Sequence, residues 1–228
     1  TRKVDEMLSR FLKYFNYDVG TMCLKIVNEV TPLKLSESII VEGKMNNVIR
    51  TVVRDIIKIF KENKEGEFSL PEDLNSENTE YDFTQLDTTF SVYLEINQDD
   101  RVKTFETDGD YYPEDNIIYV SIVHNPNVGN EILQELTGEL NEVIQHELVH
   151  IRQHEQDFDF PPEPKSPKKY YTQRHELEAQ RKGFKRRSKQ EKKEYEIIVR
   201  NWFAKYPHKH NLNPKQVEDV VQQIISEQ

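Results

Sequence analysis

The 228-residue chain has little cysteine and no long hydrophobic run. Its single cysteine, Cys23, excludes a disulfide within these residues and fits a reducing compartment. No apolar run approaches the roughly 18 residues that a membrane span needs, and no secretory signal opens the sequence. Hydrophobic residues make up 36% and charged residues 32%, which indicates a thinly cored, soluble protein above the disordered range. We therefore expect a cytoplasmic protein with no membrane partner.

Apolar residues are spaced as helices toward both ends of the chain and as strands in the middle. Helical steps of three and four cover residues 4–15, 48–60, 192–205 and 213–225, with a stretch of uncertain type at 22–30. Alternation predicts strands over 90–96 and 117–123. Residues 101–107 are expected to return antiparallel to the first of these strands and to turn at 107–110.

The pattern H-E-x-x-H occurs at His146-Glu147-Leu148-Val149-His150, at the end of an amphipathic stretch. This stretch predicts a helix with Asn130 as its N-terminal cap. Positions four apart lie one turn above each other, so His146 and His150 project from one helical face. Two imidazoles placed in this way can bind one zinc ion, with Glu147 positioned to act on a water molecule. The alternative is two solvated histidines on an ordinary charged helix.

A catalytic zinc ion usually takes three protein ligands, so a third ligand is required. His154 continues the spacing, but three helical turns climb about 12 Å, too far for ligands that lie near 2 Å from one metal. After a proline-rich stretch, residues 170–180 read as a second helix in which Glu176 and Ala179 form E-x-x-A. His175 and Glu178 are rival ligands on other faces of that helix. The residues alone leave this choice open.

H-E-x-x-H followed by E-x-x-A resembles the gluzincin class of zinc metallopeptidases over roughly residues 130–185. The resemblance implies that His146, His150 and Glu176 bind Zn2+, and that Glu147 is the general base for peptide-bond hydrolysis. It also implies an α+β, zincin-like fold in which a small, mostly antiparallel sheet packs on the H-E-x-x-H helix. The edge strand of such a sheet pairs with an extended protein or peptide substrate. A looser similarity is to small stand-alone zinc peptidases encoded in phage and bacterial genomes.

On this basis we expect three regions that together form one compact unit. They are a helical region over 1–66, a zincin-like catalytic core over 67–187 and a helical region over 188–228. The chain departs from the class at Gln180, where many members carry an Asp that orients a ligand histidine, so that partner must come from elsewhere. Hydrolysis also needs a donor to the tetrahedral oxyanion. The candidates are Tyr170, Tyr171, His175 and His208.

A basic stretch supports a different kind of function. Residues 165–193 contain twelve lysines and arginines against three glutamates, whereas the whole chain carries a net charge of −10. Such polarity is typical either of a solvated helix face or of a surface for nucleic acid or an acidic partner. Aromatic residues are sparse there, which does not favour stacking on single-stranded nucleic acid. The alternative function is therefore a non-catalytic, zinc-containing binding protein.

Overall fold

The computed structural model describes residues 32–74, 80–83, 87–162 and 164–226, with side chains from Met45 onward. The helix expected over 4–15, the stretch 22–30 and Cys23 lie outside these residues. The chain divides into two compact units, Thr1–Asn46 and Asn47–Gln228. Helix α3, Pro32–Glu62, begins in the first unit and ends in the second, and every later element belongs to the second unit.

The second unit contains a five-stranded mixed sheet with the order β1-β3-β5-β4 and with β2 paired to β3. The strands are β1 Gly66–Leu70, β2 Tyr81–Phe83, β3 Thr88–Gln98, β4 Phe105–Tyr112 and β5 Ile117–His124. The central pair β3 and β5 is parallel, whereas β1 and β2 pair antiparallel with β3, and β4 pairs antiparallel with β5. The expected α+β class is therefore confirmed, with a mixed sheet.

The strand that follows β3 pairs differently from the expectation. The sequence predicts that residues 101–107 return against β3 and turn at 107–110, and this prediction is wrong. β4 pairs with β5 instead, with Gly109 opposite Val120 in mid-strand. The turn comes at residues 113–116, where Asn116 has a φ of 55° in the left-handed region that Asn tolerates. Asp and Gly usually mark turns, but an edge strand accepts them because only one of its sides must pair.

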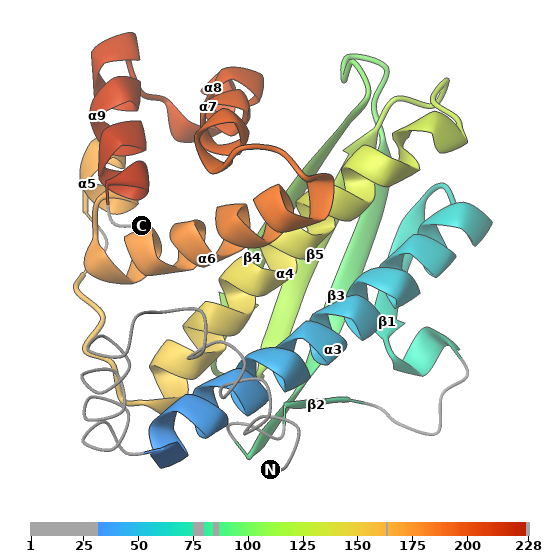
Figure 1. Ribbon diagram of the computed structural model, residues 1–228. Coiled ribbons are helices and arrows are strands. Elements are labelled where there is room, and N and C mark those ends of the chain that lie inside the picture. Colours follow the sequence, from blue (N-terminus) through green and yellow to red (C-terminus); the bar gives the residue numbers. More distant parts are fainter. Residues whose placement is uncertain (1–31, 75–79, 84–86, 163, 227–228) are drawn as a thin grey trace, which may run out of the picture. The chain divides into compact units, whose positions relative to one another are not determined.

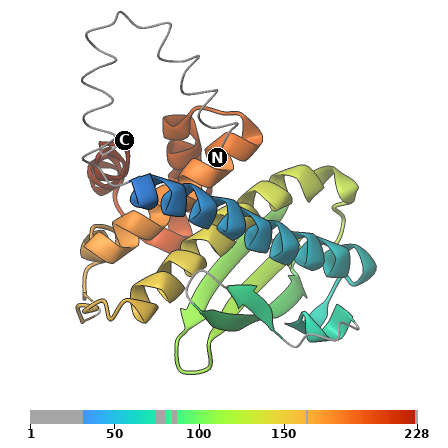
Figure 2. The ribbon, with the colours of Figure 1, turned by 60° about the horizontal axis from the view of Figure 1, so that its bottom comes forward.

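One face of the sheet is covered by the part of α3 from Asn47 onward and by α4, Leu133–Glu155 (Figures 1 and 2). Alternate residues of β3 and β5 point into this interface, as the two-residue period of a strand requires. On α3, Phe60 packs edge-on against His124 of β5, with ring centroids 5.2 Å apart. On α4, the side chains at four-residue steps are completely buried: Leu136, Leu140, Ile144 and Leu148. The helix expected over 48–60 and the strands over 90–96 and 117–123 are confirmed.

The start of α4 differs from the expectation. Residues Asn130–Ile132 form a 3-10 turn, and α4 begins after Ile132, without a hydrogen bond from a capping side chain. Asn130 is therefore not the cap, and that prediction is wrong. Glu131 takes over part of the role, because its carboxylate accepts a hydrogen bond of 2.8 Å from the Gly129 N–H just before the turn.

Residues 170–180 form parts of two helices rather than one. α5, Pro167–Tyr171, ends at Thr172, and α6, Arg174–Glu191, starts after Gln173, which has an extended ψ of 143°. α6 crosses α4 closely (Figure 1). A Cβ atom on Gly183 would lie only 2.9 Å from the backbone oxygen of Glu142, and Ala179 is completely buried. Small side chains therefore set the separation of the two helices.

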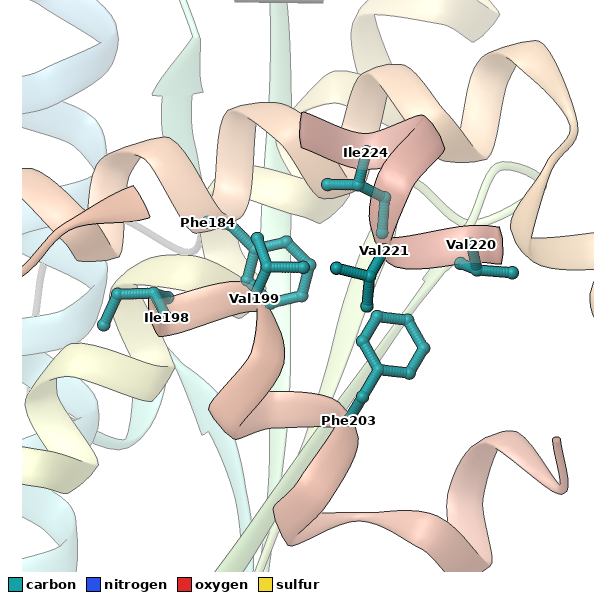
Figure 3. Close-up of a cluster of buried hydrophobic side chains, with 7 residues drawn as sticks. All are labelled: Phe184, Ile198, Val199, Phe203, Val220, Val221 and Ile224. Carbon is teal, nitrogen blue, oxygen red and sulfur yellow. The ribbon is translucent and has the colours of Figure 1, made fainter. Parts of the chain in front are cut away.

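The C-terminal helices share a core with α6. They are α7 Tyr195–Lys205, α8 Pro207–His210 and α9 Pro214–Ile225. Figure 3 shows their buried contact, in which side chains from α7 and α9 meet Phe184 of α6. Asn213 and Gln216 form a reciprocal capping box at the start of α9, as the expected start at 213–214 required. Among the described residues, no helix combines the length and apolar character needed to cross a bilayer.

Candidate metal centre

Three side chains from α4 and α6 converge on one point. The Nε2 atoms of His146 and His150 lie 3.0 Å apart. Glu176 reaches them from α6, with Oε2 3.6 Å from His146 Nε2 and Oε1 3.5 Å from His150 Nε2. One ligand atom from each of the three residues lies within 4.8 Å of the others, so together they could hold a metal ion.

These separations suit a small tetrahedral cation. Ligands that lie about 2.0–2.1 Å from zinc at tetrahedral angles are about 3.3 Å from one another. The observed 3.0, 3.5 and 3.6 Å fall on both sides of that value. Glu176 is only 5% exposed, and no lysine or arginine of the described residues forms an ion pair with it. A buried carboxylate needs a compensating positive charge, so the donor set fits a zinc ion that keeps its fourth position open.

The surroundings of His146 and His150 shift the pKa values of these two residues in opposite directions. Burial lowers the pKa of His146, but the carboxylates of Glu147, Glu176 and Glu142 outweigh it and raise that pKa to about 9. Burial and the charge of His146 lower the pKa of His150 to about 4. Without a metal, the cluster therefore carries a proton on His146, which a cation must displace in order to bind.

The rival ligands do not join the group of three. His175 Nε2 is 3.5 Å from Glu176 Oε1, but its ring packs against Phe158 and Phe160, with centroids 5.8 and 5.2 Å away. Glu178 is held by Arg152 at 2.6 Å and by Gln153 at 3.0 Å. His154 is exposed. Of the candidates, Glu176 is the one that meets both histidines of the motif.

Gln153 orients the second histidine. Its amide oxygen lies 2.9 Å from His150 Nδ1, which directs Nε2 of the same ring toward His146 and Glu176. Its amide nitrogen donates to the Glu178 carboxylate at 3.0 Å and to the backbone oxygen of His175 at 3.2 Å. Gln153 therefore orients a ligand histidine, the role that an Asp at position 180 would have by the resemblance and that Gln180 does not fill. The sequence analysis missed it, although it lies three residues after His150 on the same helical face.

Glu147 lies between the edge strand β4 and His146, in the same pocket as the histidine. It is 4% exposed, and a Cβ atom on Gly109 of β4 would lie 3.3 Å from its Oε1. Burial raises the pKa of Glu147 to about 8; Asp110, Glu176 and Asp108 add to the rise, whereas His146 opposes it. A pocket of about 190 Å3 lies here, lined by residues 107–110 of β4 together with His146, Glu147 and Glu176. These β4 residues were expected to form a turn, which hid their place at the site.

A buried ionic network lies behind the pocket. Arg187 of α6 donates to Glu142 at 2.9 Å and to Glu139 at 3.2 Å on α4, and to Glu191 at 2.6 Å on its own helix. Glu139 also accepts from Tyr206 at 2.5 Å. Lys205, the last residue of α7, also pairs with Glu139 at 2.8 Å, so the network joins α4, α6 and α7 beside His146.

Two of the four candidate oxyanion donors lie at the pocket. Tyr170 and Tyr171 line it, and burial together with the nearby charges of Glu176 and Glu147 raises the pKa of the Tyr170 hydroxyl. His175 is held in the Phe158 and Phe160 contact, and His208 is paired with Glu106 of β4 at 3.0 Å.

The basic stretch occupies the other side of α6. Its cations line a cleft of about 570 Å3 that contains a single carboxylate, Glu178. The cations of this cleft are Arg174, Arg181, Lys182, Lys185 and Lys189. We call the pocket beside Glu147 the acidic pocket, because its lining has several carboxylates and no lysine or arginine. The basic cleft and the acidic pocket lie on opposite faces of α6.

Comparisons of the chain with protein-family models, with curated proteins and with solved structures give no match.

Proposed function

We propose that this chain is a zinc-dependent metallopeptidase with a zincin-like active site of the gluzincin kind. The observation that carries the proposal is the convergence of His146, His150 and Glu176 next to Glu147, beside the edge strand β4. A fortuitous H-E-x-x-H would not require a buried carboxylate from a second helix to meet both histidines. Cytoplasmic residence and a protein or peptide substrate belong to the same proposal.

Each residue has a distinct role. His146, His150 and Glu176 would hold the zinc ion, which when bound lowers the pKa of a water ligand toward about 7 and polarises a carbonyl. Glu147 accepts the proton of the attacking water at its carboxylate and passes it to the leaving amine. The pKa of about 8 that burial gives Glu147 in the zinc-free protein would fall when a cation binds beside it, which favours the ionised carboxylate that acts as the base. The Tyr170 hydroxyl donates to the developing oxyanion.

The edge strand would orient the substrate. Among the strands that the structure describes, β4 pairs with β5 alone, and the Thr107 carbonyl accepts from Lys209 Nζ at 2.6 Å. Backbone groups of alternate residues in a strand point to the same side, so those of Gly109 are directed to the free edge beside Glu147. An extended peptide added there would present its backbone to the general base.

The test is zinc content together with peptide cleavage in matched variants. Glu147→Gln should retain zinc and lose about 100-fold or more in kcat, because general acid–base catalysis typically contributes 10²–10⁴-fold. Glu155→Gln, an exposed glutamate near the end of the same helix, is the control and should leave cleavage unchanged. His150→Ala should lose both zinc and cleavage. Unchanged cleavage by the Glu147 variant would overturn the proposal.

A second candidate function rests on the basic cleft of α6. Five cations against one carboxylate, which is itself paired with Arg152, make a surface suited to a polyanion such as nucleic acid. Reversing Lys182, Lys185 and Lys189 to Glu should abolish salt-dependent nucleic-acid binding, whereas reversing three exposed lysines elsewhere should not. The control lysines are Lys58, Lys61 and Lys103. Binding that survives the first reversal, or that does not weaken with salt, would exclude this function.

A further inference from the structure

All charged side chains that line the acidic pocket, apart from His146, are carboxylates. The pocket has no lysine or arginine in its lining. The carboxylates are Asp108 and Asp110 of β4, Glu142 and Glu147 of α4, and Glu176 of α6. Glu142 is paired with Arg187 at 2.9 Å and Asp108 with Lys209 at 3.4 Å, while Glu147 and Glu176 belong to the proposed hydrolytic site. Asp110 forms no hydrogen bond or ion pair with any described residue; it is exposed, and it is one of the residues that line the pocket.

A buried acceptor in the same pocket also lacks a partner. Gln180 is only 7% exposed and lines the pocket, and its Oε1 atom has no hydrogen-bond partner among the described residues. An unpaired buried acceptor costs free energy until a donor reaches it. The carboxylates nearby are acceptors when ionised and cannot satisfy it. The polar lining therefore demands a ligand that is positively charged and rich in donors.

The walls of the pocket are aromatic. Tyr170, Tyr171, Phe184 and Trp202 line it together with the carboxylates. Ring faces attract cations, and a planar guanidinium also stacks on them. At about 190 Å3 the pocket is smaller than the roughly 300–1,000 Å3 of pockets for whole small molecules, so it suits one side chain.

We propose that the pocket binds a basic side chain of the substrate next to the scissile bond, with arginine favoured over lysine. The inference rests on the proposed peptidase function, since it assigns the specificity of that same site. A peptide paired along the free edge of β4 sends every second side chain to the same face, so one of them enters the pocket beside Glu147. The five N–H donors of a guanidinium can serve Asp110 and Gln180 Oε1 together, whereas an ammonium is a compact point charge.

Binding can be followed without turnover, because Trp202 is the only tryptophan of the chain and lines the pocket. The probes are short peptides, blocked at both ends, that carry arginine, lysine or citrulline at one position. Citrulline keeps the shape of arginine and removes its charge. Titrations follow tryptophan fluorescence in the zinc-loaded Glu147→Gln protein, and kcat/KM is measured with the wild type. We expect the arginine peptide to bind and react about fivefold better than the citrulline peptide, because one partly exposed charge pair contributes up to about 1 kcal/mol.

Asp110→Asn should bring this ratio close to one, while Asp115→Asn, an equal charge change in the turn after β4, should preserve it. Asp110→Ser is the second variant if the amide fails to fold. Equal binding of arginine and citrulline peptides by the wild type, or a ratio that Asp110→Asn leaves intact, would overturn the inference even if peptides are cleaved. If the same peptides bound only after their amino terminus was unblocked, and equally with arginine or citrulline, the inference would be overturned as well. An arginine preference in fluorescence without any cleavage would instead support the pocket and refute the peptidase.

Discussion

Replacing Gln153 with methionine should weaken zinc binding although no ligand is touched. Gln153 is 3% exposed, and its only contact with the candidate centre is the 2.9 Å hydrogen bond to His150 Nδ1. Partners of this kind fix the tautomer and the ring orientation of a ligand histidine, and their loss typically costs 10–100-fold in metal affinity. That range corresponds to about 1.4–2.7 kcal/mol, since a tenfold change is about 1.4 kcal/mol.

The same substitution should also destabilise the fold, by a separate route. It leaves the His175 backbone oxygen and one oxygen of Glu178 without the amide donor, at 3.2 and 3.0 Å. Leaving a buried group unsatisfied costs about 1–3 kcal/mol, although Glu178 keeps Arg152 at 2.6 Å. For a chain of 228 residues this predicts a fall in Tm of roughly 2–4 °C per kcal/mol.

A second variant separates the two effects. Gln153→Glu keeps an acceptor for His150 but places a carboxylate against Glu178, so it should retain zinc affinity and lose stability. Competition with a chromogenic chelator measures the zinc affinity, and thermal unfolding of the zinc-free protein measures stability. Gln156→Met, on an exposed residue at the end of α4, is the control for both. If Gln153→Met binds zinc as tightly as the wild type, Gln153 does not orient His150 and the reasoning fails.

Three further predictions follow from contacts around the site. Gly109→Ala should cost about 1–3 kcal/mol of stability and lower activity, because the added Cβ atom would lie 2.4 Å from Val143 Cγ1 and next to Glu147. The double variant with Val143→Ala should recover most of the stability and most of the activity. If it recovers neither, the cause is not steric. Arg187→Met should destabilise the protein by about 3–5 kcal/mol, because it leaves Glu142 buried and unpaired, although Glu139 keeps Lys205 at 2.8 Å. Arg200→Met, in an exposed pair, should cost less than about 1 kcal/mol, and similar losses in the two variants would contradict the network. Because the pKa of His146 is raised from 6.5 to about 9, the zinc-free protein should lose stability as the pH rises from 6.5 to 9. Over the same range zinc should bind more tightly, and its binding should release a proton. Calorimetry in buffers of different ionisation enthalpy tests this, because the binding enthalpy would not depend on the buffer if His146 carried no proton.

Strong periodicity made part of the fold predictable. The apolar steps of the helix over 48–60 and the alternation of β3 and β5 identify both the element and its buried face, because burial against one neighbour leaves a regular pattern. The pairing of β4 was not predictable in this way. Its Asp108, Gly109 and Asp110 lie in a strand because Gly109 allows close approach to α4 and because the edge needs no partner. Local composition records neither of these tertiary causes.

The helix break before α6 was hidden for a related reason. Residues 170–180 have no proline or glycine, so nothing local separates α5 from α6. The extended backbone at Gln173 redirects the chain, so that Tyr170 on α5 lies at the pocket while Glu176 on α6 meets the histidines. The sequence could therefore suggest both residues as candidates, but it could not place them at one site.

The sequence of α4 also contains a pattern that predicts the second helix of the site. The face of α4 toward α6 carries polar residues in register with the motif, at steps of three and four. They are Glu139, Glu142, His146, His150 and Gln153. All but the two histidines are at most 8% exposed, and both histidines are partly buried, so α4 is buried on an apolar face and on a polar one. An exposed helix has no reason to keep such a stripe aligned over four turns with two histidines inside it. A polar stripe in register with H-E-x-x-H therefore predicts a second helix that supplies the missing ligand and the countercharges, and here α6 provides Glu176 and Arg187.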